Sequence, residues 1–337
     1  MAFSGSRAAR SVAFEAAGSV AFEGKRSVAS VGKRSVAFPP LDWEMPKAGI
    51  VTVAGKPNAG KSTLLNRIIG QKLAITSQKP QSTRDKVVGI HTTADMQMIV
   101  FDTPGLLEPK YELQESMRST ALRALEDADV IIYVADASNG APEPLDAAAS
   151  LTKPPHAPVI EAINKIDTLP SERREQLREQ RPDSIQISAL TGEGIDTLMA
   201  RIAEGLPESP FLYPEDDVST QSERFFVSEL IRETVLEQLH DEVPYSVAVG
   251  IEEFREGRVP LYIRAVVYVE RDSQKRIIIG AKGGRIRELG QAARKKIEAF
   301  TDQRVYLDLW VKVLPNWRRS TSALERFGYH IRKEERT

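Results

Sequence analysis

The sequence contains a glycine-rich stretch, Gly55-Lys56-Pro57-Asn58-Ala59-Gly60-Lys61-Ser62, directly after an apolar run at 48–54. The glycines allow the backbone to turn so that successive N–H groups face one anion. We expect Lys61 to act in catalysis through its positive charge and Ser62 to be a magnesium ligand. A helical pattern begins at Thr63. This order of strand, loop and helix predicts a phosphate loop for a nucleoside triphosphate, with the residues from Gly55 to Thr63 at the nucleotide.

The composition limits the function classes. A length of 337 residues is typical of two or three domains. The chain contains no cysteine, which excludes disulfides, cysteine-bound metals and a thiol nucleophile. No apolar run is long enough to span a membrane. The net charge of −1 conceals a basic segment, because Arg271–Lys296 holds nine basic and two acidic residues. This segment predicts a polyanionic partner for the C-terminal part of the chain.

The first 44 residues differ from the rest of the chain. The pattern Ser-Val-Ala-Phe-Glu occurs at 11–15 and 19–23, and shorter versions follow at 27–30 and 35–38. A repeat of about eight residues is too short for a solenoid unit, so we expect a disordered, low-complexity arm at 1–44. The alternative is that Met45 is the natural start and that the arm has no function.

Further apolar runs alternate with helical patterns at 96–101, 130–135, 159–163 and 184–187. This alternation predicts an α/β fold at 45–208, with a mainly parallel sheet and helices on both faces. Polar residues follow each run. Because ligands bind at the carboxyl ends of strands in such sheets, we expect these polar clusters to form one site.

The first polar cluster is Asp102-Thr103-Pro104-Gly105, followed by Leu106, and we expect these five residues at the nucleotide. An aspartate at a strand end can reach Mg²⁺ through water, and the Gly105 N–H can meet a γ-phosphate, so both are expected to act in catalysis. GTPases of the Ras type carry a water-orienting glutamine at the position of Leu106. A leucine side chain forms no hydrogen bond, so another group must position the water, and we expect slow turnover.

Two later clusters predict specificity for guanine. Asp167, in the stretch Asn164-Lys165-Ile166-Asp167, can accept hydrogen bonds from both N1–H and the exocyclic amine of guanine, a pair that adenine lacks. Asn164 and the stem of Lys165 can brace the base. The stretch Ser188-Ala189-Leu190, after the next strand, can add backbone donors to the guanine oxygen.

The ordered series of these motifs resembles the GTP-binding domains of the translation-factor-related class. The resemblance implies that Thr83 acts in catalysis by completing the Mg²⁺ shell in the triphosphate state, together with Ser62 and, through water, Asp102. Ser82 lies beside Thr83, which leaves the choice between the two hydroxyls open. In some of these relatives an asparagine at the position of Asn58 holds K⁺; the alternative is that Asn58 only satisfies the loop backbone.

The C-terminal part predicts a second domain. A proline-rich, acidic segment at 209–220 is typical of a linker. The patterns that follow predict a helix at 225–239, strands at 245–251 and 261–269, a helical segment, a G-x-x-G loop at 280–283, a helix to residue 300 and a strand at 305–313. This order fits the type II KH topology, an α+β RNA-binding module at 221–331, with a tail at 332–337.

The G-x-x-G loop lies in the basic segment. Its glycines allow a single-stranded backbone to approach closely, the lysine and arginine meet phosphate, and isoleucines offer an apolar floor for bases. The residues expected at RNA are Ile277, Ile278, Gly280, Ala281, Lys282, Gly283, Arg285 and Ile286. The alternative is a basic, solvated helix with a glycine turn.

A GTPase domain followed by a type II KH domain resembles the Era family of bacterial GTPases. The stretches at 228–233, 239–249 and 307–313 carry the likeness, which extends over about 47–331. The resemblance implies partners beyond GTP, GDP and Mg²⁺, namely the 3′ end of 16S rRNA and the 30S ribosomal subunit, whose assembly the protein assists. It also implies a monomer in the cytoplasm, with peripheral association at the inner face of the cell membrane.

The two domains together predict a GTP-driven RNA-binding switch, in which the triphosphate orders the loops of Thr83 and Gly105 and changes how the KH surface is presented to RNA. Two alternatives follow from the same residues. One is an RNA-binding protein whose nucleotide pocket only stabilises the fold. The other is a metabolic kinase or an ATPase that uses the same phosphate loop.

Overall fold

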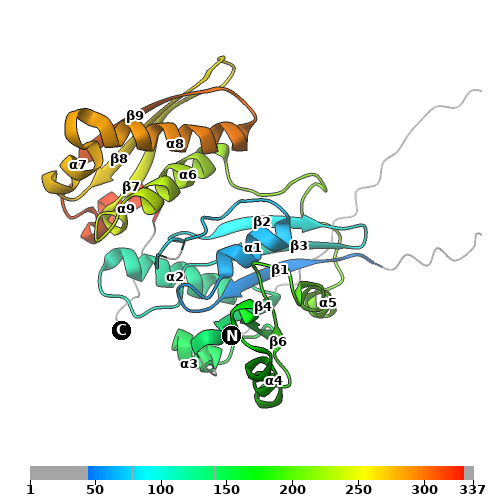
Figure 1. Ribbon diagram of the computed structural model, residues 1–337. Helices are drawn as coiled ribbons and strands as arrows, with labels where there is room; N and C mark the ends of the chain where they lie inside the picture. Colours follow the sequence, from blue (N-terminus) through cyan, green and yellow to red (C-terminus); the bar gives the residue numbers. More distant parts are fainter. Residues whose placement is uncertain (1–44, 78, 140–141, 330–337) are drawn as a thin grey trace, which may run out of the picture. The chain divides into compact units, whose positions relative to one another are not determined.

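The computed structural model describes residues 45–77, 79–139 and 142–329 (Figure 1). The expected arm at 1–44 and the tail from 332 lie outside the described residues. The described chain forms a first lobe, built from the elements between residues 47 and 205, and a second lobe, built from those between 223 and 326. Each lobe contains its own sheet.

The sheet of the first lobe has the strand order β2-β3-β1-β4-β5-β6. β2 is antiparallel to β3, and the other neighbouring pairs are parallel. The strands are β1 (Lys47–Ala54), β2 (Val87–Thr92), β3 (Met96–Asp102), β4 (Val130–Asp136), β5 (Val159–Asn164) and β6 (Ile185–Gln186). The expected α/β fold with a mainly parallel sheet is confirmed. The sequence patterns did not indicate β2, which pairs at the edge of the sheet.

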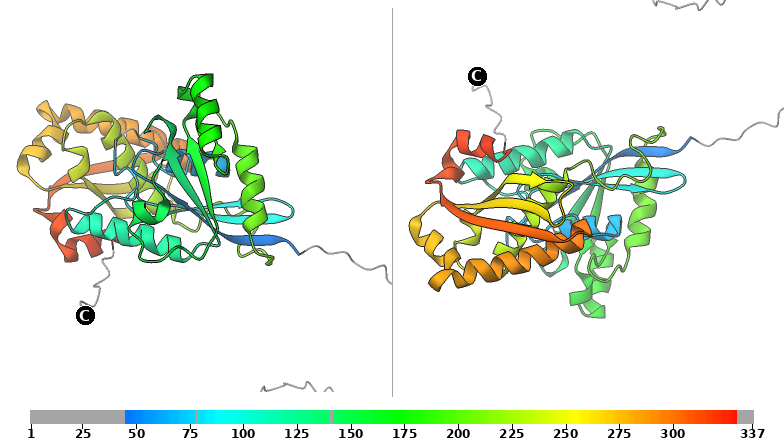
Figure 2. Two further views of the ribbon diagram at one scale, coloured as in Figure 1. Left: turned by 90° about the horizontal axis from the view of Figure 1, so that it is seen from below. Right: turned by 90° about the horizontal axis from the view of Figure 1, so that it is seen from above.

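Helices cover both faces of this sheet. They are α1 (Lys61–Ile69), α2 (Glu112–Glu126), α3 (Leu145–Ala149), α4 (Ser171–Gln180) and α5 (Ile195–Gly205), with short 3₁₀ helices η1 (Ala137–Asn139) and η2 (Ile166–Thr168). Alternate residues of a strand point to opposite faces, so Val130 and Ile132 pack with α1 and α5 whereas Ile131 and Tyr133 pack with α2 and α3. The views in Figure 2 show the strands between α2 and α5.

The segment expected to be a linker lies along the edge of the first sheet. Ile90 N donates to Val218 O at 2.9 Å, and the Ser219 hydroxyl donates to Val88 O at 2.6 Å. Gln97, which is fully buried, accepts hydrogen bonds from the backbone N–H groups of Leu212 and Tyr213. The contacts to Val88 and Ile90 supply partners for the backbone of the edge strand β2, whereas Gln97 attaches the segment to β3.

The sheet of the second lobe has the order β7-β8-β9, with β7 antiparallel and β9 parallel to β8. Its elements are α6 (Glu223–Gln238), η3 (Pro244–Ser246), β7 (Ala248–Arg255), β8 (Leu261–Val269), α7 (Asp272–Ile279), η4 (Ala281–Gly283), α8 (Gly284–Thr301), β9 (Val305–Val313), η5 (Trp317–Arg319) and α9 (Thr321–Arg326). The order and pairing fit the predicted KH topology. The expected strand at 245–251 begins only at Ala248, because Pro244, whose φ is fixed, starts a 3₁₀ turn.

Two hydrophobic clusters lie on opposite faces of the sheet of the second lobe. Ile263, Ala265 and Val267 of β8 pack against α6, α7 and α8, whereas Val266 and Tyr268 face Trp317 and the last helix. Figure 1 shows α6 and α8 side by side over the sheet. None of the helices in the described part of the chain has the length and apolar character that crossing a bilayer requires.

Candidate nucleotide-binding site

A cavity of about 550 Å³ opens at the carboxyl ends of the first sheet. Each of the predicted clusters of the first lobe contributes to its lining. The expected residues that line it are Pro57, Asn58, Gly60, Lys61, Ser62, Thr63, Thr83, Gly105, Asn164, Lys165, Asp167, Ala189 and Leu190. The segments lie far apart in sequence, and the parallel strands bring their ends to one place, as expected.

The phosphate loop depends on its glycines. Gly55 has a φ of +149°, and a Cβ added there would lie 2.3 Å from the carbonyl oxygen of Val134. Gly60 has a φ of +98°, and its Cβ would lie 2.2 Å from Nδ2 of Asn164. The loop leads into α1, whose N-terminus has no side-chain cap among the described residues, so its N–H groups remain available to an anion.

Lys61 is buried beneath the loop. Its ammonium group donates hydrogen bonds to the carbonyl oxygens of Gly55, at 3.0 Å, and Lys56, at 2.9 Å. Burial lowers the pKa of Lys61 to about 8, and the negative charge of Asp102 partly opposes this shift. A buried ammonium group whose partners are neutral carbonyls is stabilised when an anion binds nearby. The arrangement therefore favours phosphate binding.

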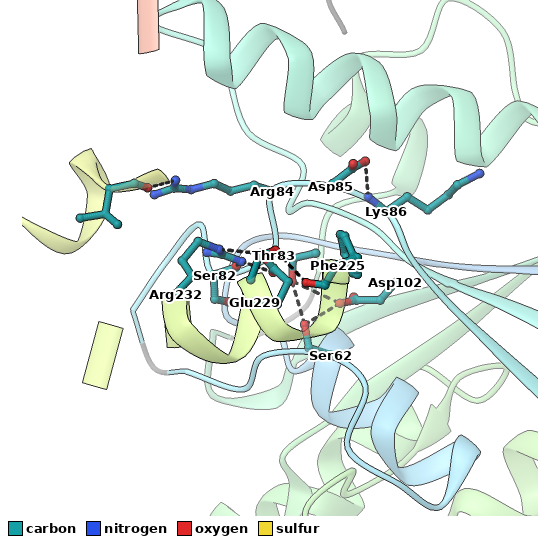
Figure 3. Close-up of polar contacts among 12 residues, drawn as sticks. Ser62, Ser82, Thr83, Arg84, Asp85, Lys86, Asp102, Phe225, Glu229 and Arg232 are labelled. Atoms are coloured by element: carbon teal, nitrogen blue, oxygen red, sulfur yellow. Dashed lines mark hydrogen bonds and ion pairs between the residues drawn. The ribbon is translucent and has the colours of Figure 1, made fainter. Parts of the chain in front are cut away.

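Three oxygen-bearing side chains meet beside the loop (Figure 3). Ser62 Oγ donates to Asp102 Oδ2 at 2.6 Å, and Thr83 Oγ1 lies 2.9 Å from Ser62 Oγ and 3.2 Å from Asp102 Oδ2. Of the neighbouring pair Ser82 and Thr83, Thr83 is therefore the residue whose hydroxyl reaches this cluster.

The cluster has the chemistry of a site for a hard cation. Asp102 is fully buried, and its Oδ1 has no hydrogen-bond partner among the described residues. Burial raises the pKa of Asp102 to about 6, against the opposing effects of Lys61, Ser62 and Thr83. Since an unpartnered buried carboxylate oxygen is costly and Mg²⁺ prefers oxygen ligands, the residues fit this metal.

The residues after Asp102 have different surroundings. Thr103 is fully buried and donates from Oγ1 to Val53 O at 2.8 Å. A Cβ on Gly105 would lie 2.7 Å from Pro57 N, which explains the glycine. Leu106 packs in the core beside α2, and its N–H donates to Gly55 O at 3.0 Å. Its side chain thus points away from the cavity, and Leu107, which the motif did not indicate, lines it instead.

Asn164 connects two loops of the site. Its Nδ2 donates to Ala59 O at 2.8 Å, and its Oδ1 accepts from Ala189 N at 2.9 Å. Asp167 accepts from Ser188 Oγ at 2.6 Å and also lines the cavity. Asn164 therefore braces the loops, whereas Asp167 has an oxygen that can face a base.

Two supporting residues were missed by the motifs. Asp136, at the end of β4, forms an ion pair of 2.6 Å with Lys165, whose φ of +68° turns the chain at this point. Arg67 of α1 donates from Nε to Ala189 O at 3.1 Å. An acidic residue directly after an apolar run was the only sequence signal for Asp136, and Arg67 gave none because its partner lies more than a hundred residues away.

The G-x-x-G loop of the second lobe forms η4 between α7 and α8. Gly280 and Gly283 have φ values of +71° and +74°, and Lys282 between them has +47°. A Cβ on Gly280 would lie 2.7 Å from that of Arg285, whereas the space around Gly283 is open. The loop thus exposes its backbone, as an approach by a nucleic-acid strand requires.

The isoleucines divide between the surface and the core. Ile277 is 40% exposed, whereas Ile278 is fully buried in the core of the second lobe, and Ile286 packs at its margin. The expectation that Ile278 contacts bases is therefore wrong, because the helical phase of α7 turns it inward.

A groove of about 390 Å³ adjoins the loop. Among its lining residues, Arg287, Arg294 and Tyr306 were not expected at RNA, while Gly283 and Ile286 were. The spacing of Arg287 and Arg294 on α8, two turns apart, was the signal available in the sequence.

Comparisons with known proteins match parts of both lobes. Residues 50–165 match the family model described as 50S ribosome-binding GTPase, and residues 242–318 match the KH domain model. The chain is 44% identical to GTPase Era of Ectopseudomonas mendocina, over 86% of this chain and 99% of the relative. It is 45% identical to GTPase Era of Halothermothrix orenii, over 84% and 98%.

Two solved structures are similar over 84% of this chain and 99% of their own, each with a TM-score of 0.79 and 39% identity. One is Era in complex with MgGDPNP and nucleotides 1506–1542 of 16S ribosomal RNA. The other is a single-residue variant of Aquifex aeolicus Era bound to GDP.AlF4⁻.

Proposed function

Because this chain belongs to the Era family of GTPases, we propose that it is a GTP-driven switch that binds the 3′ end of 16S rRNA and assists assembly of the 30S subunit. The observation that carries this proposal is the presence of two sites in one chain. The cavity of the first lobe gathers the residues for GTP, and the second lobe presents a basic G-x-x-G loop. An Era structure that is similar over 99% of its own chain contains both MgGDPNP and a fragment of 16S ribosomal RNA.

The first lobe binds GTP through complementary contacts. The phosphates lie on the N-terminus of α1, where Lys61 exchanges its carbonyl partners for phosphate oxygens. Asp167 accepts hydrogen bonds from guanine, while Asn164 keeps the two loops around the base in place. A bound Mg²⁺, held by Ser62 and Thr83 and through water by Asp102, would offset the negative charge that develops on the phosphates.

Hydrolysis in this site does not use a glutamine-like side chain after Gly105. Leu106 is buried, so the attacking water is positioned by another group. We propose that K⁺ binds near Asn58, since a monovalent cation would add positive charge beside the phosphates. The position of Asn58 in the lining of the cavity supports this role.

The second lobe binds single-stranded RNA. Lys282 and Arg285 meet phosphates at the G-x-x-G loop, and Ile277 and Ile286 contact bases beside it. The groove that contains Arg287 and Tyr306 continues from the loop and extends the contact along the strand. We further propose that the protein is a cytoplasmic monomer with peripheral contact at the cell membrane, as the family resemblance implies.

A comparison of phosphate release by the full chain and by Lys61→Ala tests the enzymatic part. The full chain is expected to release phosphate from GTP in the presence of Mg²⁺, and Lys61→Ala to fall to background. Equal release would favour the alternative of an RNA-binding protein whose nucleotide site is structural. Faster hydrolysis of ATP than of GTP would favour the kinase or ATPase alternative.

A further inference from the structure

The segment that carries Thr83 lies against the second lobe. Arg84, the next residue, is 2% exposed and reaches the turn before β7. Its Nη1 donates to Val247 O at 2.5 Å, and its Nη2 donates to Tyr245 O at 3.1 Å. The guanidinium also lies 5.8 Å from the centre of the Trp317 ring. A buried arginine thus attaches the chain beside Thr83 to the second lobe.

A second arginine holds the same segment from the opposite side of Thr83. Arg232 of α6, also 2% exposed, donates from Nη2 to the carbonyl oxygen of Ser82. Glu229, one turn earlier on α6, fixes the guanidinium by accepting from Nε at 2.8 Å and from Nη2. The residues before and after Thr83 are therefore both bound to the second lobe.

Neighbouring side chains point in opposite directions along this segment. Figure 3 shows Thr83 directed toward Ser62 and Asp102, while Arg84 extends away from them and Arg232 approaches from α6. A hydroxyl within 3.2 Å of two magnesium-ligand candidates needs a fixed backbone, because free rotation of a loop would lose this geometry. The two arginines supply that fixation.

We propose that Arg84 and Arg232 are positioning residues for GTP hydrolysis, which hold Thr83 at the magnesium site so that the second lobe completes the nucleotide site. The inference rests on the proposed function, since it assumes that Thr83 joins the Mg²⁺ shell when a triphosphate is bound. A ligand that orders Thr83 would then also strengthen the contact with the second lobe, because such coupling is reciprocal.

Other contacts between the lobes provide a matched control. Lys72 forms an ion pair of 2.8 Å with Glu233 of α6, which Lys296 of α8 also contacts at 2.8 Å. This pair joins the same helix to the first lobe, but it does not involve the residues next to Thr83. Loss of the Lys72 contact therefore removes an interaction between the lobes without releasing Thr83.

The experiment compares Arg84→Met and Arg232→Met with Arg84→Lys, Arg232→Lys and the control Lys72→Met in the full chain. Methionine keeps the length of the side chain but removes its donors, whereas lysine can still donate to one carbonyl. The measurements are kcat and KM for GTP, and the affinities for GDP and for a non-hydrolysable GTP analogue at saturating Mg²⁺.

Each methionine variant is expected to lower kcat by about 10-fold or more, since misplacement of one ligand disturbs the transition state. The affinity for the analogue falls relative to that for GDP, the lysine variants recover part of the loss, and Lys72→Met behaves as the unmodified chain. An unchanged kcat and affinity ratio would overturn the inference. A joint loss of GDP and analogue binding, as in a misfolded variant, would assign the arginines to stability alone and overturn it as well. Absence of GTP hydrolysis by the unmodified chain would instead contradict the proposed function.

Discussion

Asn164 donates a hydrogen bond from Nδ2 to the carbonyl oxygen of Ala59, 2.8 Å away, and so ties the end of β5 to the phosphate loop. Its Oδ1 accepts from the N–H of Ala189, which belongs to the loop after β6. The side chain is only 2% exposed. One buried amide thus links the part of the site that binds phosphate to the part that surrounds the base.

Replacement of Asn164 with alanine should weaken GTP and GDP binding alike. The change leaves a buried carbonyl and a buried N–H without their partners, which costs about 1–3 kcal/mol each. We expect the nucleotide-bound state to bear about 1.4–2.8 kcal/mol of this cost, which lowers the affinity about 10- to 100-fold. Titration with a fluorescent GDP derivative measures the effect. Gln176→Ala, on the exposed face of α4, serves as the control. An Asn164→Ala variant with unchanged affinity for both nucleotides would contradict the bracing role.

Replacement of Asp167 with asparagine should change the base that the site accepts. An amide side chain can pair with the carbonyl of xanthine at the position where the carboxylate meets the amine of guanine. We expect weaker hydrolysis of GTP and a gain with xanthosine triphosphate, measured by phosphate release. If the preference among GTP, xanthosine triphosphate and ATP stays unchanged, Asp167 does not read the base.

The stability of the chain without nucleotide and Mg²⁺ should decrease between pH 4 and pH 7. Burial raises the pKa of Asp102 from 3.8 to about 6, so in this range the folded chain binds a proton that the unfolded chain has released. Asp102→Asn removes the titrating group, and its free energy of unfolding should rise relative to that of the unmodified chain, by on the order of 3 kcal/mol at pH 7. Urea unfolding at both pH values measures the difference; parallel pH profiles would show that Asp102 is not the group responsible.

Replacement of Lys282 and Arg285 with glutamate should abolish binding to a single-stranded oligonucleotide from the 3′ end of 16S rRNA and leave GTP hydrolysis unchanged. The change reverses two charges at the exposed G-x-x-G loop. Arg178→Glu with Arg201→Glu makes the matched control, because these exposed arginines lie on α4 and α5 and, among the residues that the structure describes, each forms an ion pair only with a glutamate of its own helix. Equal loss of affinity in both double variants would show that the loss results from the change in net charge and not from the G-x-x-G loop.

Potassium should accelerate GTP hydrolysis several-fold over sodium at equal ionic strength, and Asn58→Ala should remove this difference. The reason is that a fixed cation beside the phosphates stabilises charge that develops in the transition state. Phosphate release in KCl and NaCl provides the test. Equal rates in the two salts for the unmodified chain would show that Asn58 does not hold K⁺ and only supports the backbone of the phosphate loop.

The sequence predicts the residues of the nucleotide cavity well, because each motif follows an apolar strand and the parallel sheet brings strand ends together. It predicts less where tertiary packing decides. Ile277 and Ile278 look alike in the sequence, yet only the phase of α7 determines which one is exposed. Arg84 and Arg232 carried no signal for their joint contact with the Thr83 segment, because their partners lie far away along the chain.

The most direct test of the proposed switch is the affinity of the full chain for the 3′-terminal oligonucleotide of 16S rRNA, measured by titration with GDP and with a non-hydrolysable GTP analogue at fixed Mg²⁺ and salt. We expect tighter binding with the analogue than with GDP, and loss of this difference in Thr83→Ala. Equal affinity in the two nucleotide states would show that GTP does not control RNA binding.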